Sequence, residues 1–261
     1  HVKGFLIPGS TGDGWEMVDR EIRQLLEIAL DQCVKLNLHL LIGVLKTDAA
    51  EARRTILDTM EWLKARTSES DALAALQQAR VCGFTVCPPK GKELSQEQIS
   101  AALASVLETG LPCSLYQLPQ VTQNEMTPET VAQLSRRFPN FILFKDTSGA
   151  DRVALSGQDL GGVFLVRGAE SNYAHWPRTG GGPYDGFLLS TANCFARELH
   201  RVTQELAANH LTVAHVLSDR LTQVVNEVFQ VVAAVPEGNA FANANKALDH
   251  FFAHGPKAAA L

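Results

Sequence analysis

The chain has 261 residues, a formal net charge of -5 and no basic stripe, so nucleic acid is not expected as a partner. Its apolar runs are far shorter than the roughly 20 residues of a membrane-spanning helix, so a membrane is not expected either. The five cysteines form no CxxC pair, and the histidines show no metal-ligand spacing. Reduced thiols, a cytoplasmic location and no metal site follow as predictions.

Short apolar runs alternate with longer stretches of helical periodicity along the whole chain. Helical segments are predicted at residues 18–36, from 48 to a polar interruption at 67–70, at 71–82, from 95 to about 110, from 127, and from 195 onward with interruptions at 209 and 236–238. Strands are predicted at residues 4–8, 38–45, 84–87, 112–118, 141–145, 163–167 and 186–190. This alternation is typical of a parallel sheet with right-handed crossovers.

The alternation fits two architectures, a closed barrel and an open doubly wound sheet. The open sheet usually carries a nucleotide-binding loop after its first strand, but residues 9–14 (GSTGDG) match neither a GxGxxG nor a Walker sequence. We therefore predict an α/β fold, a (β/α)8 TIM barrel over residues 1–194 with a C-terminal helical extension over 195–261. Seven strands are one short of a closed barrel, so the first strand and helix are expected to be missing from this chain.

Lys145 directly follows the apolar run of the fifth predicted strand. The C-terminal ends of barrel strands form the active face, and burial there disfavours an ammonium ion. A neutral amine attacks a ketone to form an imine, which then acts as an electron sink. The alternative is a lysine that reaches solvent or pairs with Asp146.

Polar groups on two other strand ends are candidates for the same site. Tyr116 lies one strand earlier at the same depth, where its phenol could carry protons; alternatively it is a core tyrosine with a satisfied hydroxyl. Ser10 and Thr11 follow the first strand in a turn of small residues. Their hydroxyl and N–H groups could hold a carboxylate, or they form an ordinary polar turn.

Three segments together carry a resemblance to a known family: GSTGD at residues 9–13, YQLP at 116–119 and KDTSG at 145–149. They resemble the signatures of the dihydrodipicolinate synthase and N-acetylneuraminate lyase family. The resemblance implies a Lys145 Schiff base with pyruvate or another 2-oxo acid, and a Tyr116 proton shuttle. It also implies a homotetramer built as a dimer of dimers.

The resemblance implies further substrate-binding residues. Ser10 and Thr11 would bind the carboxylate common to the substrates. The ends of the last two strands would contact the variable part of the substrate, through Gly168, Ala169 and Ser190.

Two positions depart from the family pattern. Synthases usually have Pro-Tyr-Tyr after the third visible strand, and its second tyrosine joins the proton relay across the dimer, whereas residues 88–90 read Pro-Pro-Lys. Synthases also have an arginine five residues past the catalytic tyrosine, where this chain has Val121. The apolar residue resembles the sugar-acid branches of the family and favours a 2-keto-3-deoxy sugar acid.

The sequence therefore predicts a carbon–carbon or carbon–oxygen lyase, an aldolase or dehydratase acting on a small-molecule 2-oxo acid or 2-keto-3-deoxy sugar acid. No metal or organic cofactor is implied, because the imine supplies the electron sink. Two alternatives stay open. One is a phosphate-binding barrel isomerase that uses residues 178–183 (RTGGGP). The other is a non-catalytic relative that binds a 2-oxo acid.

Overall fold

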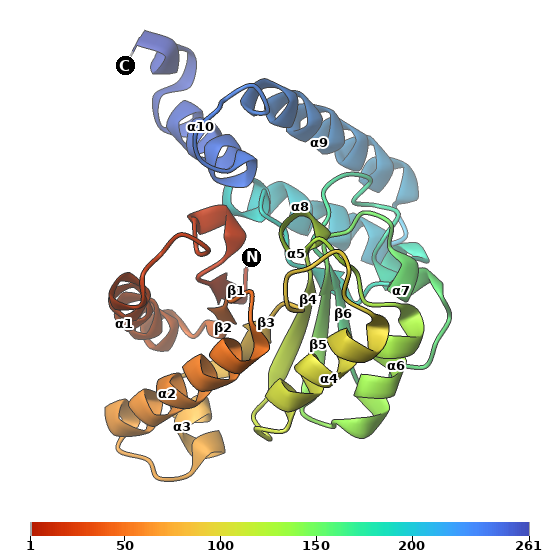
Figure 1. Cartoon of the computed structure of the whole chain (residues 1–261). Coiled ribbons are helices and arrows are strands. Elements are labelled where there is room, and N and C mark those ends of the chain that lie inside the picture. Colours follow the sequence, from red (N-terminus) through yellow and green to blue (C-terminus); the bar gives the residue numbers. More distant parts are fainter. Residues whose placement is uncertain (1, 261) are drawn as a thin grey trace.

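The computed structural model of the chain, which describes residues 2–260, is built around one parallel sheet. The sheet curls into an incomplete barrel, and within residues 2–260 no strand pairing joins its first strand to its last (Figure 1). Its seven strands are hydrogen-bonded in chain order: β1 (Gly4–Ile7), β2 (His39–Val44), β3 (Val81–Val86), β4 (Cys113–Gln117), β5 (Phe141–Asp146), β6 (Phe164–Arg167) and β7 (Gly186–Phe187). The predicted barrel architecture, one strand short of closure, is confirmed.

Helices follow most of the strands and cover the outside of the sheet, and the last three form a layer above it (Figure 1). The α-helices are α1 (Asp19–Leu36), α2 (Ala49–Thr67), α3 (Ala72–Gln78), α4 (Gln96–Leu107), α5 (Pro119–Thr122), α6 (Pro128–Arg137), α7 (Arg152–Leu155), α8 (Ala192–Ala207), α9 (Leu211–Val232) and α10 (Ala240–His254). Three short 3-10 helices are η1 (Ser10–Gly12), η2 (Arg178–Gly180) and η3 (Gly255–Ala260).

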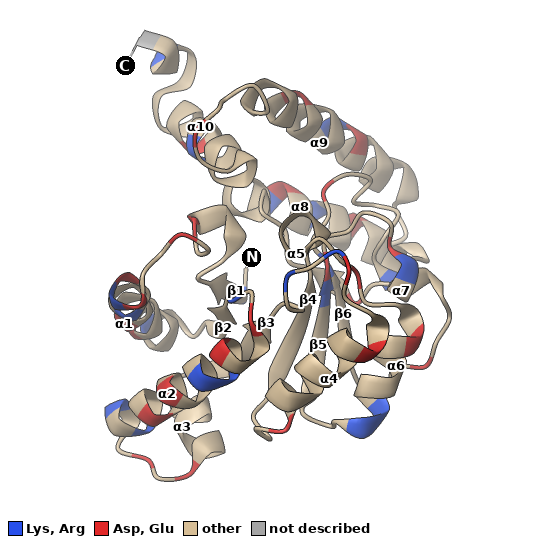
Figure 2. Cartoon of the chain, in the orientation of Figure 1, with Lys and Arg blue, Asp and Glu red and all other residues tan. Residues whose placement is uncertain are grey.

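Side-chain caps explain why several helices begin where the sequence predicts. The Asp48 carboxylate accepts a hydrogen bond from the backbone N–H of Glu51 at the start of α2. Ser95 and Gln98 form a reciprocal capping box at the start of α4. Across residues 2–260, no helix is both long and apolar enough to cross a membrane. Figure 2 shows charges of both signs along the outer helices, including α1 and α2.

Two predicted boundaries were wrong. The helix predicted over residues 71–82 ends at Gln78, because Arg80 adopts a left-handed φ of 58°. Gly83 lies inside β3 (Val81–Val86). A Cβ atom there would lie 2.4 Å from the carbonyl oxygen of Pro112, so glycine permits the close approach of the two strands. The last strand, predicted to reach residue 190, is limited to the two residues of β7.

The hydrophobic core contains two large clusters of buried side chains and a small third one, described with the site below. The larger cluster fills the space between the sheet and its outer helices, including Ile42, Phe84 and Phe144, which are 0–1% exposed. The smaller of these two joins residues beyond the last strands to the C-terminal helices, and Val202 and Val225 are at its centre. The C-terminal ends of the strands lie beside this second cluster, and they carry the polar residues described next.

Candidate active site

Lys145 and Tyr116 lie next to each other at the C-terminal ends of β5 and β4, where they are register partners. Lys145 is 9% exposed and Tyr116 is 2% exposed. The Lys145 Nζ atom lies 4.0 Å from the centroid of the Tyr116 ring. The adjacent Asp146 directs its Oδ1 atom to the backbone N–H of Ser148 at 2.8 Å. The structure therefore places the amine against an aromatic face inside the barrel.

A cavity of about 1250 Å³ lies beside Lys145 and extends between the edge strands β1 and β7. It brings together most of the residues that the sequence singled out: Ser10, Thr11, Tyr116, Lys145, Gly168 and Ser190. Ala169 is not part of its lining, and the Ala169 carbonyl accepts a hydrogen bond from the Arg167 guanidinium at 2.7 Å. The substrate-contacting role of Ala169 stays a prediction, and its carbonyl group is already engaged by Arg167.

Gly168 determines how closely the end of β6 approaches the lysine. A Cβ atom at this position would lie 2.2 Å from the Thr147 Oγ1 atom and 2.8 Å from the Lys145 Cε atom, so only glycine fits here. Thr147 itself was not predicted as a site residue. Its buried hydroxyl lines the same cavity and has no hydrogen-bond partner within the described part of the chain. Its position two residues after Lys145 was the available sequence signal.

Glu170 is a half-buried acidic residue whose carboxyl group is affected by the charge of Lys145. Burial raises the pKa of this carboxyl group, whereas hydrogen bonds from Thr191 and Tyr173 and the charge of Lys145 lower it. The Thr191 N–H and hydroxyl donate to the carboxylate at 3.0 and 2.6 Å, and the Tyr173 hydroxyl donates at 2.9 Å. Glu170 therefore fastens the loop after β6 to the start of α8.

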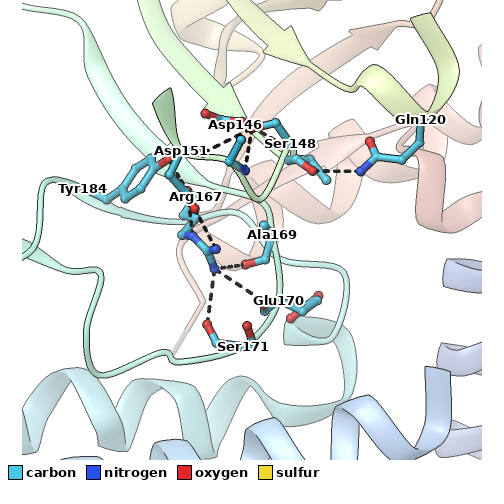
Figure 3. Close-up of polar contacts among 11 residues, drawn as sticks. Gln120, Asp146, Ser148, Asp151, Arg167, Ala169, Glu170, Ser171 and Tyr184 are labelled. Carbon is cyan, nitrogen blue, oxygen red and sulfur yellow. Dashed lines mark hydrogen bonds and ion pairs between the residues drawn. The ribbon is translucent and has the colours of Figure 1, made fainter. Parts of the chain in front are cut away.

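A buried ion pair joins the loops that follow β5 and β6 (Figure 3). The Arg167 guanidinium donates to both Asp151 carboxylate oxygens, at 2.8 and 3.0 Å. It also donates to the carbonyl groups of Ala169 and Ser171, and the Tyr184 hydroxyl donates to Asp151 at 2.6 Å. Sequence reasoning missed this pair, because its partners lie 16 positions apart and no local pattern joins them.

We expect Arg167→Met to lower the free energy of unfolding by about 3–5 kcal/mol, the usual effect of breaking a buried ion pair by removing one partner. The Asp151 carboxylate would stay buried, with the two side chains of the present pair only 4% and 1% exposed. Equilibrium urea denaturation measures the change. Arg137→Met is the control, because Arg137 and Glu108 are 63% and 53% exposed and such pairs contribute about 0–1 kcal/mol. Equal losses in both variants would contradict the prediction.

Helix α10 connects the loops that follow the two edge strands. The Asn239 amide donates to the Ser10 carbonyl at 3.1 Å and to the Asp13 carboxylate at 2.7 Å. On the other side, the Asn245 amide donates to the Ser190 hydroxyl at 2.7 Å. β1 and β7 do not pair with each other within residues 2–260. The hydrogen bonds from α10 therefore hold the loops after these two strands in their relative positions.

The two positions that depart from the family pattern differ in their surroundings. Val121 is half-buried against a small apolar cluster composed of Leu45, Cys87, Tyr116 and Leu118. Burial raises the pKa of the Cys87 thiol to about 12, which keeps it a neutral member of that cluster. The Pro89 carbonyl accepts a hydrogen bond from the Asn124 amide at 2.8 Å, and Lys90 is exposed. The surroundings of Val121 are therefore apolar, and residues 88–90 supply no phenol.

A comparison with known families identifies the family of the chain. The profile of the Dihydrodipicolinate synthetase family matches residues 65–241, which is more than half of the chain. The chain belongs to this family. A curated relative, 4-hydroxy-tetrahydrodipicolinate synthase from Lactococcus lactis subsp. cremoris (strain MG1363), is 23% identical over 239 residues, covering 90% of this chain and 73% of the relative.

Solved structures of family members show the same fold. The 2-keto 3-deoxygluconate aldolase from Picrophilus torridus superposes with a TM-score of 0.71 at 18% identity, covering 95% of this chain and 81% of that one. YagE, a prophage protein of the dihydrodipicolinic acid synthase family from Escherichia coli K12 in complex with pyruvate, gives a TM-score of 0.70 at 20% identity, with 95% and 76% coverage. At these sequence identities, the structural similarity shows that the chain shares this fold.

Proposed function

We propose that this family member is a lysine Schiff-base lyase that cleaves, condenses or dehydrates a 2-oxo acid through Lys145. The observation that carries the proposal is the buried amine of Lys145 beside Tyr116, facing a cavity that Ser10 also lines. A buried amine, a phenol and an anion-binding turn are the groups that imine chemistry on a 2-oxo acid requires. The relative in complex with pyruvate supports the choice of substrate class.

Each group has a role in the proposed reaction. The Lys145 amine adds to the keto carbon, water leaves, and the protonated imine accepts the electron pair of a bond to the adjacent carbon, either the carbon–carbon bond to the departing aldehyde or a carbon–hydrogen bond. In dehydration the second route gives an enamine, which expels the hydroxyl group of the next carbon, together with a proton, as water. When a carbon–carbon bond breaks, the electron pair stays as an enamine and an aldehyde departs. Tyr116 takes the hydroxyl proton of the departing aldehyde and returns a proton to the enamine carbon. Hydrolysis of the imine then frees Lys145.

The experiment that tests this proposal is borohydride trapping followed by intact-mass spectrometry, across a panel of 2-oxo acids. Borohydride reduces the imine to a stable secondary amine. Imine formation releases water and reduction adds two hydrogens, so a productive acid adds its own mass less one oxygen. We expect an adduct with pyruvate and with 2-keto-3-deoxy sugar acids. A chain that binds these acids without any adduct would instead be the non-catalytic relative, and the lyase proposal would be wrong.

The phosphate-binding isomerase finds less support in the geometry. Arg178, the cation of the glycine-rich loop, donates to the Asp185 carboxylate at 2.6 Å. The backbone of Gly182 packs so closely on Trp176 that a Cβ atom would lie 2.2 Å from the Trp176 carbonyl oxygen. The loop is thus occupied with its own contacts, and we assign it a structural role.

A 2-keto-3-deoxy sugar acid is the substrate class that we propose, because Val121 lies in the apolar cluster around Tyr116. An arginine would pair with a second substrate carboxylate in a bidentate ion pair, which valine cannot form. We expect condensation of pyruvate with aspartate semialdehyde to have a kcat/KM at least about 10-fold below that for 2-keto-3-deoxygluconate cleavage, the size of a lost hydrogen bond to a charged group. Steady-state assays of both reactions measure this ratio.

A gain-of-function variant controls the substrate prediction. Val121→Arg should raise kcat/KM for aspartate semialdehyde and leave the adduct with pyruvate unchanged. Comparable turnover of both substrates by the unmodified chain would show that another group binds the second carboxylate.

We also propose a homotetramer, as the resemblance to the family implies. Helix α9 supports an interface, because apolar side chains along it are exposed, among them Val216, Val224 and Val231. Light scattering after size-exclusion chromatography gives the mass that decides between a tetramer and smaller assemblies.

A further inference from the structure

The Trp15 indole makes a direct contact with one of the candidate substrate-binding residues. Its Nε1–H group donates a hydrogen bond to the Ser10 hydroxyl oxygen at 2.9 Å. We propose that Trp15 is a positioning residue that holds the Ser10 hydroxyl as a donor to the substrate carboxylate. This inference rests on the proposed function, because it assumes a 2-oxo acid bound as an imine at Lys145.

The loop between β1 and α1 brings the indole back onto Ser10. The backbone N–H groups of Gly12 and Gly14 both donate to the Gly9 carbonyl, at 3.0 and 3.1 Å. A Cβ atom on Gly14 would lie 2.9 Å from that carbonyl oxygen, so glycine makes the turn possible. The turn allows Trp15 to reach a side chain five positions earlier.

Both ends of this contact are fixed by the surrounding structure. The Asn239 amide of α10 donates to the Ser10 carbonyl at 3.1 Å and so fixes the serine backbone. The half-buried indole packs against the cluster that contains Tyr116 and Cys87. The hydrogen bond from Trp15 therefore joins two groups whose positions are independently constrained, and little conformational entropy is lost when it forms.

The chemistry of the two groups fixes the direction of the hydrogen bond. An indole N–H is only a donor, whereas a serine hydroxyl has one proton and two lone pairs. Trp15 occupies one lone pair of Ser10, so the Ser10 proton must point elsewhere. Ser10 lines the cavity together with Lys145, and a hydroxyl proton directed there selects an acceptor. A substrate carboxylate oxygen supplies one.

A role in carboxylate binding predicts a particular kinetic pattern. The substrate carboxylate takes no part in bond breaking, so its contacts are equally strong in the ground state and in the transition state. Losing such a contact raises KM and leaves kcat nearly unchanged. A hydroxyl that relayed protons would instead lower kcat, and this difference separates positioning of Ser10 from proton transfer through it.

The test compares Trp15→Phe with the unmodified chain, by borohydride labelling at increasing pyruvate concentrations and by steady-state turnover. Phenylalanine keeps an aromatic ring in the cluster and removes the N–H donor. We expect the half-saturating pyruvate concentration to rise roughly 5- to 20-fold, within the range for a weakened hydrogen bond to a charged group, with labelling at saturation and kcat little changed. Trp62→Phe on α2 is the matched control, since Trp62 packs against Arg23 on the outer surface.

Two further variants separate the hydrogen bond from packing. Trp15→His is smaller but keeps a ring N–H, so it should bind pyruvate more tightly than Trp15→Phe. The double variant Ser10→Ala/Trp15→Phe should bind pyruvate no more weakly than Ser10→Ala alone, because Trp15 acts through Ser10. If Trp15→Phe does not fold, the same comparison is made with histidine at position 15. Pyruvate binding by Trp15→His is then compared with binding by the double variant Ser10→Ala/Trp15→His.

The outcomes distinguish this inference from the function on which it rests. An unmodified chain that pyruvate never labels overturns the proposed function, and the inference with it. A labelled chain whose Trp15→Phe variant keeps the original half-saturating concentration overturns the inference alone. Full additivity with Ser10→Ala, or a loss confined to kcat, overturns it as well.

Discussion

Lys145→Arg is expected to abolish both the pyruvate adduct and turnover. Arginine keeps the positive charge and most of the reach of lysine, but its guanidinium stays protonated and has no free electron pair to attack a carbonyl. The variant should still fold, because Lys145 lines a cavity of about 1250 Å³ that leaves room for the longer side chain. Intact-mass spectrometry after borohydride reduction, with steady-state turnover, measures both losses.

A second lysine controls for the chemical change itself. Lys46→Arg alters a lysine whose side chain is 18% exposed and ion-paired with Asp19 and Glu51, outside the cavity that Lys145 lines. This variant should label and turn over as the unmodified chain does. Peptide mapping should place the adduct on Lys145 alone. Labelling of the Lys145→Arg chain with pyruvate, together with turnover, would remove the basis of the proposed function.

The barrel could be predicted from the sequence because its strands are buried on both faces and read as continuous apolar runs. The run at residues 38–45 corresponds to β2 (His39–Val44), and that at 141–145 to β5 (Phe141–Asp146). The boundary at Arg80 could not be predicted, because its left-handed φ of 58° depends on how β3 docks between its neighbours. The strand predicted to reach residue 190 failed for a related reason, since only Gly186 and Phe187 pair with β6.

The candidate site likewise has residues that a sequence pattern predicts and residues whose positions depend on tertiary contacts. Residues at the C-terminal ends of adjacent parallel strands must meet at one edge of the sheet, so the approach of Lys145 to Tyr116 could be predicted. The Arg167–Asp151 pair and the hydrogen bond from Trp15 to Ser10 depend on loop conformation and side-chain direction. Neither has a periodic signature, so both emerge only from the folded chain.

Tyr116→Phe should leave the pyruvate adduct largely intact while turnover falls by roughly 10²–10⁴-fold, the usual contribution of a positioned acid–base group. The phenylalanine ring would keep the aromatic face that lies 4.0 Å from the Lys145 Nζ atom, so the amine stays in place. Only the hydroxyl is lost, and with it the group that we propose carries protons. Trapping with borohydride and steady-state assays report the two effects separately.

Tyr184→Phe distinguishes loss of a catalytic hydroxyl from loss of any buried tyrosine hydroxyl. Tyr184 is 0% exposed and donates to Asp151 at 2.6 Å, but it is not part of the cavity lining. Its removal should affect stability more than turnover, because Arg167 still satisfies both oxygens of Asp151. If Tyr116→Phe reduced turnover no more than Tyr184→Phe does, the phenol of Tyr116 would not be the proton carrier. A nucleophile would then remain at Lys145, but its protons would have to travel through another group at the strand ends. Thr147, two residues after Lys145, has a buried hydroxyl that lines the cavity.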